Sequence, residues 1–261
     1  MTMAFVDANG IRVQYELSGS EGLPVVVFSH VLGANLSMWE PQVLALAGRF
    51  RVLRYDGRGH GASSVPEGPY ALADLGRDVL GLLDALAIGR VNFCGLSIGG
   101  LVGQWLGIHA PQRLNRLVLA NTAAKIGSEE IWDARVELVE REGLAPVIPG
   151  ALERWLTAGF RAAHPEIARS AEAMMQATSP AGYMACCMAL RDADFRASLG
   201  GVALPVLVIA GSDDPVTTPG DGRFLAEAIS GARYVELQAA HLSNVDAADA
   251  FNAVLLEFLG D

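Results

Sequence analysis

Lysine is almost absent from this chain, which has one lysine, Lys125, among 19 basic residues. The 29 acidic residues outnumber them, and the formal net charge is -10 at pH 7. Nucleic-acid binding depends on basic side chains that neutralise phosphates, so this balance argues against a nucleic-acid partner. Runs of roughly 18 or more apolar residues are also absent, which argues against a membrane-spanning helix.

Cysteine is scarce too. Cys94, Cys186 and Cys187 are an odd set, and their spacing is not that of a disulfide framework or a metal site. Residues 1–7 lack the basic segment and long apolar stretch of a secretory signal. These absences predict a cytoplasmic protein with reduced thiols and without a bound metal. They leave the oligomeric state open.

Apolar residues, by contrast, are plentiful and regularly placed. They make up 51% of the chain, which is enough for a large core. Short apolar runs alternate with helical patterns over the first 120 residues, and this order predicts a mainly parallel sheet with helices on both faces. The predicted strands are 11–17, 25–28, 51–55, 91–94 and 117–120, and the predicted helices are 72–86 and 99–109.

A different pattern begins near residue 128. The next segment has helical patterns and no convincing strand; they cover 129–142, 151–163, 165–177 and 181–192. Strand patterns return at 206–209 and 233–237, each followed by a helical pattern, at 222–229 and 246–259. We therefore predict an α/β core formed by residues 1–127 and 197–261, with a helical cap, or lid, inserted at 128–196.

The pentapeptide Gly95-Leu96-Ser97-Ile98-Gly99 follows a predicted strand and opens a predicted helix. Glycines on both sides of a serine allow a sharp strand-to-helix turn that exposes the hydroxyl at the edge of the sheet. The first unpaired N–H groups of the helix then lie beside that hydroxyl, where negative charge would develop. This context makes Ser97 a candidate nucleophile.

A serine nucleophile needs a base in hydrogen-bond contact and an acid that orients the base. Asp213 and Asp214 come shortly after one predicted strand, and His241 comes shortly after the last one. The carboxyl ends of parallel strands meet at one edge of a sheet. The order serine, aspartate, histidine therefore predicts a triad of Ser97, one of these two aspartates and His241.

Two backbone N–H groups are expected to bind the oxyanion of the reaction intermediate. One belongs to Ile98, directly after the nucleophile, and the other is expected in the loop after the strand 25–28, where we favour Leu32. That loop reads Ser29-His30-Val31-Leu32-Gly33. Hydrolases often have His-Gly at this point, whereas here a β-branched valine follows the histidine.

Several stretches together resemble the α/β-hydrolase superfamily and, within it, the 3-oxoadipate enol-lactonases of protocatechuate and catechol degradation. They span nearly the whole chain and comprise residues 32–39, 51–56, 58–61, 92–97, 120–127 and 240–244. The sequences LSMW and NTAAKIG are the narrowest signatures among them. The family spacing in the acid loop favours Asp214 over Asp213. One departure lies in the oxyanion loop, where the enol-lactonase pattern is Ser-Asn-Ser-Leu-Gly, so an unchanged and an altered substrate preference both stay open.

The resemblance implies a serine hydrolase that opens 3-oxoadipate enol-lactone, a small ring with a carboxylate side arm, without a cofactor. The arm implies a cationic partner, because a buried charge without a partner is unfavourable. Arg135, at the start of the helical block, is our first candidate and Lys125 the second. Aromatic side chains of that block are expected to form the apolar wall of the cleft, namely Trp132, Trp155 and Tyr183.

Other activities would use the same three residues. A general carboxylesterase or a cofactor-free haloperoxidase of this fold needs the same triad, so we expect the helical block to separate these activities. A non-catalytic receptor for a small ligand on the same scaffold is a third interpretation. The intact order of serine, aspartate and histidine argues against it.

Overall fold

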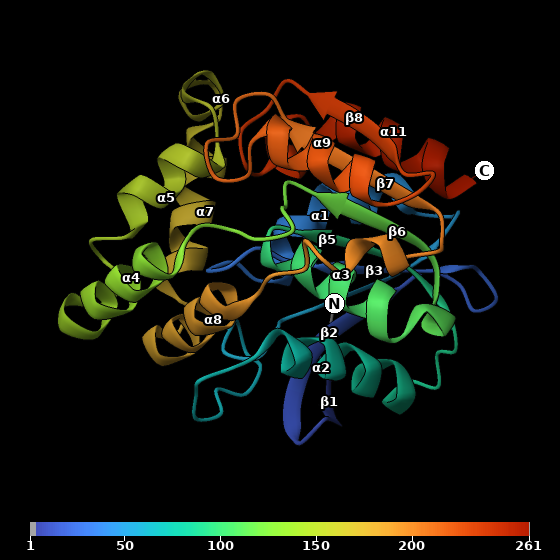
Figure 1. The fold of residues 1–261 in the computed structure, drawn as a ribbon, viewed down its shortest axis with the longest axis horizontal. Helices are drawn as coiled ribbons and strands as arrows, with labels where there is room; N and C mark the ends of the chain where they lie inside the picture. Colours follow the sequence, from blue (N-terminus) through green and yellow to red (C-terminus); the bar gives the residue numbers. More distant parts are fainter. Residues whose placement is uncertain (1–3, 261) are drawn as a thin grey trace.

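An eight-stranded sheet forms the centre of the computed structural model, which describes residues 4–260 (Figure 1). In spatial order the strands are β1 (Ala4–Ala8), β2 (Ile11–Ser18), β4 (Arg51–Tyr55), β3 (Val25–Ser29), β5 (Val91–Leu96), β6 (Leu114–Ala120), β7 (Val206–Gly211) and β8 (Arg233–Leu237). β2 pairs antiparallel with β1 and β4, and the strands from β4 to β8 run parallel. The mainly parallel sheet predicted from the sequence is confirmed.

Helices flank this sheet. α1 (Glu40–Leu46) packs on α11 (Ala248–Gly260), α2 (Leu72–Ala85) packs on α3 (Ile98–His109), and α9 (Pro219–Ala228) packs on β7. The shorter elements of the core are α10 (Ser243–Asp246) and the 3-10 helices η1 (Leu36–Trp39), η2 (Pro111–Arg113) and η3 (Leu199–Gly201). Within residues 4–260, no helix combines the length and the apolar character that a membrane crossing requires.

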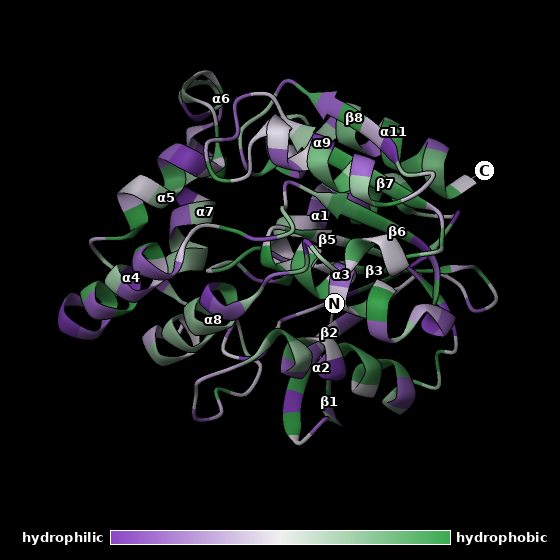
Figure 2. Ribbon diagram, viewed as in Figure 1, coloured by the Kyte–Doolittle hydropathy of each residue, from purple (hydrophilic) through white to green (hydrophobic). Residues whose placement is uncertain are grey.

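Continuous apolar runs explain the buried centre. β5 and β7 are buried along their whole length, and Figure 2 shows hydrophobic residues in the central strands and more hydrophilic ones on the outer helices. A strand that helices cover on both faces has no side toward solvent, so its sequence need not alternate. α2 instead buries one face, which includes Leu72, Leu75, Val79 and Leu82, as its helical spacing predicts.

Five α-helices lie between β6 and β7: α4 (Glu129–Glu142), α5 (Ile148–Trp155), α6 (Ala158–Ala163), α7 (Pro165–Gln176) and α8 (Pro180–Asp192). We call residues 128–196 the helical insertion; in Figure 1 it lies to the left of the sheet. The prediction of a single helix over 151–163 is wrong, because the helix breaks there between α5 and α6. Leu156 is extended there, with a ψ of 139°, and the Thr157 side chain caps a new helix by accepting the Phe160 N–H.

Close contacts join this insertion to the core. Gly182 of α8 lies so near the turn before α2 that a Cβ on it would come within 2.2 Å of the Gly59 carbonyl oxygen. On the other side, the Asp246 carboxylate accepts hydrogen bonds from the N–H and the hydroxyl of Thr157, at 3.1 and 2.9 Å. A main-chain contact and half-buried polar groups therefore join the insertion to the core at two separate places.

Candidate active site

Ser97 occupies the turn between β5 and α3 in a strained conformation. Its φ is 59° and its ψ is -118°, a region that residues with a side chain rarely adopt. The flanking positions have no room for a side chain. A Cβ on Gly95 would lie 2.0 Å from the Gly99 carbonyl oxygen, and one on Gly99 would lie 2.3 Å from the Ser29 carbonyl oxygen. The Ser97 N–H donates to two carbonyl groups at the end of β6, those of Ala120 and Asn121, each at 3.1 Å, which holds the strained turn in place.

Asp214 and His241 meet in the loops after β7 and β8. His241 Nδ1 lies 2.8 Å from Asp214 Oδ2, and both residues are buried. An ionised carboxylate only accepts hydrogen bonds, so Nδ1 carries the proton and Nε2 is left as the basic atom. His241 and Ser97 line the same cavity. Asp213, the alternative acid, is exposed and accepts a hydrogen bond from the Ser212 hydroxyl at 3.1 Å.

Additional donors surround the Asp214 carboxylate. Its Oδ2 accepts from Asn121 Nδ2 at 2.9 Å and from the Thr217 hydroxyl at 2.8 Å, and its Oδ1 accepts from the N–H groups of Val216 and Thr217. Burial alone would raise the pKa of Asp214, but the charge of His241 and the hydrogen bonds from His241 and Asn121 outweigh it and leave that pKa lowered. The carboxylate is therefore ionised and able to orient the histidine.

Asn121 and Thr217 are absent from the site predicted from sequence. Asn121 directly follows β6 with a φ of 41°, and its amide also donates to the Ala240 carbonyl oxygen at 3.1 Å. The sequence signal that could have indicated Asn121 is its position at the carboxyl end of β6, the neighbour of β5, which leads to Ser97. Such a position marks many loop residues, so it does not single out Asn121 without the fold.

The two predicted oxyanion donors are at the expected elements. Leu32 lies in the loop after β3 and lines the same cavity as Ser97, and Ile98 is the first residue of α3. Within residues 4–260, neither backbone N–H has a hydrogen-bond acceptor. Unpaired N–H groups at a helix start and in a loop beside a nucleophile can bind a developing negative charge.

The cavity beside Ser97 and His241 has a volume of about 310 Å³, which suits a small ligand. Its wall is mainly apolar, and most of it comes from the helical insertion. The lining residues are Val31, Leu32, Ser97, Ile126, Gly127, Ile131, Trp132, Arg135, Ala151, Arg154, Trp155, Met175, Tyr183, Leu190, Pro215, Val216 and His241. The structure thus brings Arg135, Trp132, Trp155 and Tyr183 to the cavity, as the sequence predicts.

Lys125 is not among these lining residues, contrary to its expected place as second partner of a substrate anion. It lines a separate surface pocket with Arg196 and Asp221. Its charge lies near acidic groups outside the cavity. The pKa values of Asp192 and Asp194 are lowered mainly by hydrogen bonds from Arg191 and Arg196, and Lys125 makes a smaller contribution in the same direction. Lys125 lies in the loop between β6 and α4, and its charge faces the exposed carboxylates of Asp192 and Asp194.

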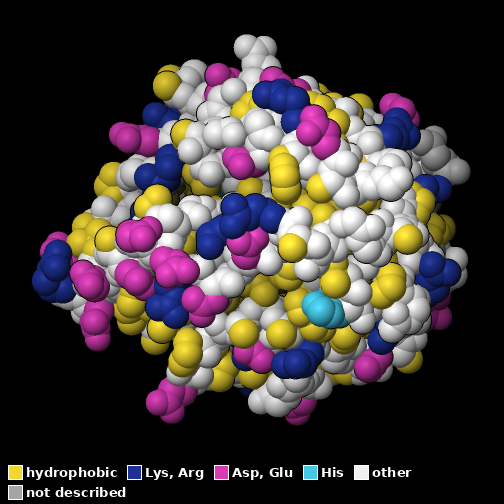
Figure 3. All heavy atoms as spheres, in the orientation of Figure 1, with side chains coloured by type: hydrophobic (Ala, Val, Ile, Leu, Met, Phe, Trp, Pro, Cys, Tyr) yellow, Lys and Arg dark blue, Asp and Glu magenta, His cyan; other side chains and the backbone are white. Residues whose placement is uncertain are grey.

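Arg154 is a second cation in the cavity that sequence reasoning missed. Burial first, and then the charge of Arg135, lower the pKa of Arg154, so the two guanidinium groups repel each other. Arg135 Nη1 donates to the Tyr183 hydroxyl at 3.1 Å, and among the described residues neither arginine has a carboxylate partner. Acidic side chains gather instead on the outer surface of α4 (Figure 3). The cavity therefore offers two positive charges to an anionic ligand.

Among residues 4–260, no group of three or more histidine, cysteine, aspartate or glutamate side chains is arranged to hold a metal ion. The polar side-chain groups of the residues that line the cavity are the hydroxyls of Ser97 and Tyr183, the imidazole of His241, two indole N–H groups and two guanidinium groups.

Comparisons with known proteins identify the family of this chain. A family described as alpha/beta hydrolase fold matches residues 24–149. 3-Oxoadipate enol-lactonase 2 of Acinetobacter baylyi is 47% identical over 245 residues, which cover 94% of this chain and 92% of that protein. The chain belongs to the α/β-hydrolase family.

This α/β hydrolase is also similar to the enol-lactonase of Burkholderia xenovorans LB400, with a TM-score of 0.97 and 45% identity over 99% of this chain and 100% of that one. A putative carbamate hydrolase of Agrobacterium fabrum, RutD, is 33% identical, with 90% of this chain and 93% of that protein covered. The resemblance to enol-lactonases seen in short sequence stretches is thus confirmed over the whole chain.

Proposed function

We propose that this protein is a serine hydrolase that opens the lactone ring of 3-oxoadipate enol-lactone or of a close analogue. One observation carries the proposal: a single cavity is lined by Ser97, His241 and two arginines that have no carboxylate partner among residues 4–260. A substrate with an electrophilic carbonyl and a remote carboxylate matches both parts of this cavity. The enol-lactonases to which the chain is similar support the same substrate class.

The reaction starts with attack of Ser97 Oγ on the lactone carbonyl carbon. His241 Nε2 takes the hydroxyl proton as the new C–O bond forms, and Asp214 stabilises the resulting imidazolium through Nδ1. The carbonyl oxygen becomes an oxyanion that the N–H groups of Leu32 and Ile98 bind. The strained turn at Ser97 keeps the attacking oxygen at the helix start throughout this step.

Collapse of this intermediate breaks the ring C–O bond. The leaving oxygen belongs to an enol, so it departs as a weaker base than an alkoxide, and it takes the proton from His241. A water molecule deprotonated by His241 then attacks the Ser97 ester, and the proton returns to Ser97 Oγ when the acyl chain leaves. The released enol tautomerises to 3-oxoadipate. Every proton transfer up to release of the enol uses His241, so these steps require no cofactor.

The two arginines are proposed to bind the carboxylate arm. A carboxylate in a mainly apolar cavity needs charge-assisted hydrogen bonds, which contribute about 1.5–3 kcal/mol each. Tyr183 fixes Arg135 from behind, and burial raises the pKa of Tyr183 to about 12, so its hydroxyl stays protonated and neutral. Trp132 and Trp155 supply apolar wall for the ring.

We further propose that the helical insertion is a cap that selects the substrate. Carboxylesterases and cofactor-free haloperoxidases of this fold would share Ser97, Asp214 and His241, so the triad leaves the substrate undetermined. The insertion contributes both cavity arginines, which favour an acidic substrate over a neutral ester. A cytoplasmic location is part of the proposal, because all three cysteines are buried and unpaired.

The test follows the ultraviolet absorbance of the enol-lactone with wild-type protein and with Ser97→Ala. We expect turnover by the wild type and only background hydrolysis by the variant. Hydrolysis of neutral aryl esters without turnover of the enol-lactone would show that the lactonase proposal is wrong and that the protein is an esterase. If the lactone raises the melting temperature but neither substrate is consumed, the protein is a receptor.

A further inference from the structure

Two buried histidines outside the proposed triad form hydrogen bonds with the backbone of the oxyanion loop. His30 belongs to that loop, after β3, and His60 belongs to the turn between β4 and α2. Their rings meet edge to face, with centroids 4.9 Å apart, and only 4% and 3% of their surfaces are exposed. The reaction as proposed gives neither of them a task.

Each ring nitrogen of His30 has a main-chain partner. Nε2 lies 2.9 Å from the Gly57 backbone nitrogen, and Nδ1 lies 2.8 Å from the Val31 carbonyl oxygen. A backbone N–H only donates and a carbonyl oxygen only accepts. His30 is therefore neutral, with its proton on Nδ1 and a lone pair on Nε2. Burial supports this form, since it is the main cause that lowers the pKa of His30.

The carbonyl that His30 holds belongs to a specific peptide group. Val31 C=O and Leu32 N–H are the two polar ends of one planar unit, and in a trans peptide they point in opposite directions. Fixing the carbonyl oxygen therefore fixes the direction of the N–H that serves as oxyanion donor. A hydrogen bond to the carbonyl also polarises the peptide, which strengthens the N–H as a donor.

His60 supports the next peptide in the same manner. Its Nε2 accepts the Gly33 N–H at 2.9 Å, and its Nδ1 lies 3.2 Å from the Arg58 carbonyl oxygen. The Gly33 carbonyl oxygen accepts the Thr178 hydroxyl of the helical insertion at 3.1 Å. The loop and the turn thus exchange two hydrogen bonds: His30 accepts from Gly57, and His60 accepts from Gly33.

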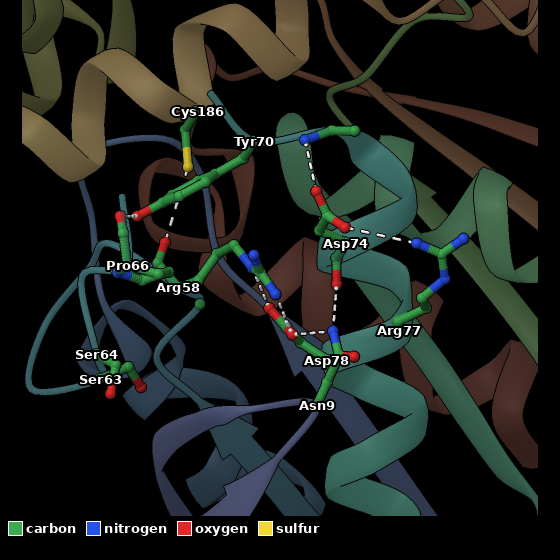
Figure 4. A network of polar contacts seen from close by, with 12 residues as sticks. Asn9, Arg58, Ser63, Ser64, Pro66, Tyr70, Asp74, Arg77, Asp78 and Cys186 are labelled. Carbon is green, nitrogen blue, oxygen red and sulfur yellow. Dashed lines mark hydrogen bonds and ion pairs between the residues drawn. The ribbon is translucent and has the colours of Figure 1, made fainter. Parts of the chain in front are cut away.

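The turn itself is rigidly attached. Arg58 forms a two-pronged ion pair with Asp78 of α2, with both N···O distances at 2.6 Å, and the Asn9 amide donates to the same carboxylate at 2.8 Å (Figure 4). Cys186 of α8 contacts the Arg58 carbonyl oxygen at 3.7 Å. Because the turn is anchored to both core and insertion, it is a firm support for the loop beside Ser97.

We propose that His30 is a positioning residue for the oxyanion hole, which orients and polarises the peptide that donates the Leu32 N–H. His60 completes the arrangement by holding the following peptide. The inference rests on the proposed acyl-transfer function but not on the identity of the substrate. It also explains how the loop keeps its form with a valine after His30: the histidine, at 2.8 Å from the Val31 carbonyl oxygen, holds this peptide together with the Ala34 N–H, which donates to the same oxygen at 3.2 Å.

The test compares His30→Asn, His30→Gln and His30→Ala. The asparagine Nδ2 occupies the place of histidine Nδ1 and retains the donor to Val31, whereas glutamine and alanine lose it. Removal of an oxyanion donor lowers kcat by about 10²–10³-fold; we expect misdirection of one to lower kcat by about 10- to 100-fold in the glutamine and alanine variants. KM should change less than about 3-fold, and His30→Asn should retain kcat within about 5-fold.

A second readout separates positioning from folding. A boronic acid that forms a tetrahedral adduct with Ser97 should bind His30→Ala more weakly by the same factor as the loss of kcat, while binding of the product should not change. His109→Gln, at an exposed position at the end of α3, is the matched control and should behave as wild type. Melting temperatures are measured for all variants, and the kinetics are recorded well below them.

Three outcomes would overturn the inference. His30→Ala could retain kcat, His30→Asn could lose as much kcat as His30→Ala, or boronate and product binding could weaken equally. The kinetics can use whichever substrate the wild type consumes, enol-lactone or aryl ester. A wild type that hydrolyses only the ester contradicts the lactonase proposal, and the role of His30 is still decided.

Discussion

The backbone carbonyl of Arg154 accepts a hydrogen bond from the backbone N–H of His241 at 3.2 Å, while the Arg154 side chain lines the cavity beside that histidine. The next pair repeats the link, since the Leu242 N–H donates to the Trp155 carbonyl oxygen at 2.8 Å. One residue of the insertion therefore contacts both the proposed base and the space for the substrate. Its side chain can be changed without removing the main-chain bond.

Replacement of Arg154 by glutamine should separate acidic from neutral substrates. We expect kcat/KM for a lactone with a carboxylate arm to fall by about 10- to 100-fold, because a hydrogen bond to a charged group contributes about 1.5–3 kcal/mol. For a neutral ester, kcat/KM should stay within about 2-fold, as the main-chain bond remains. Arg141→Gln, exposed on α4 and paired with Glu142, is the control. Equal losses on both substrates would contradict a role in carboxylate binding.

Substitution of the two neighbouring aspartates identifies the acid. Asp214→Asn should lower kcat by about 10³–10⁴-fold, because an amide at this place favours the wrong tautomer of the histidine. Asp213→Asn makes the same change of charge one residue away, at an exposed position, and should leave kcat within about 2-fold. Steady-state kinetics of both variants decide the matter. A larger effect of Asp213→Asn would reverse the assignment.

Strain at Ser97 predicts an unusual stability difference. Ser97→Ala and Ser97→Gly both remove the hydroxyl, so both should be inactive. Only glycine adopts a φ of 59° with a ψ of -118° without strain; relief of about 1–3 kcal/mol exceeds the entropic disadvantage of glycine, roughly 0.5–1 kcal/mol. Urea unfolding should therefore find Ser97→Gly more stable than Ser97→Ala by about 1 kcal/mol. The reverse order would mean that the surroundings do not strain this turn.

The contact between Gly59 and Gly182 predicts opposite effects of one substitution at two helical sites. Gly159→Ala in α6 meets nothing within 4 Å and should stabilise the protein by up to about 1 kcal/mol, since alanine favours helices. Gly182→Ala forces its Cβ onto the Gly59 backbone and should destabilise it by about 1–3 kcal/mol. Thermal unfolding measures both changes, and equal melting temperatures would argue against tight backbone contact.

Burial of His60 predicts a loss of stability in mild acid. Its pKa is lowered to about 3, chiefly by burial, so at pH 5 the unfolded state binds a proton that the native state does not. Stability is fully present above the unfolded pKa of about 6.5 and falls below it, by about 2 kcal/mol at pH 5 for this residue. His60→Gln keeps an acceptor for the Gly33 N–H but cannot titrate. The free energy of unfolding of the wild type minus that of the variant should therefore decline between pH 7 and pH 5; a constant difference would contradict the prediction.

Local patterns predicted most of the fold. The buried parallel strands have continuous apolar runs, and their predicted places agree with β3, β4, β5 and β7 to within about two residues, the usual uncertainty of element ends. Sequence reasoning missed β1 and α1. β1 is a five-residue edge strand with an exposed Asp7, and α1 has only seven residues. Short elements of this kind form because neighbours bury them, so their own sequence contains little signal.

In the candidate site, too, some residues have a local sequence signal and others are placed by tertiary packing. Ser97, Asp214 and His241 follow strands, and the topology of a parallel sheet is enough to bring their loops to one edge. Arg154 lies on a short helix of the insertion, where the sequence predicted one longer helix, and its direction depends on how α5 packs on α7. Likewise, the exclusion of Lys125 from the cavity follows from tertiary packing. Helical periodicity identifies a face, but it does not say what that face meets.

The meeting of Gly59 with Gly182 limits how this enzyme can be re-engineered or can diverge. Cavity side chains on α4 and α5, such as Arg135 and Arg154, can be exchanged one at a time, because they belong to other helices than the contact between α8 and the turn. If the helical insertion were replaced by that of another hydrolase, however, the new segment would need a glycine at the position of Gly182 and a hydroxyl that reaches the Gly33 carbonyl oxygen, as Thr178 does. New substrate ranges are therefore reached more readily by mutation within the existing insertion than by recombination of whole segments.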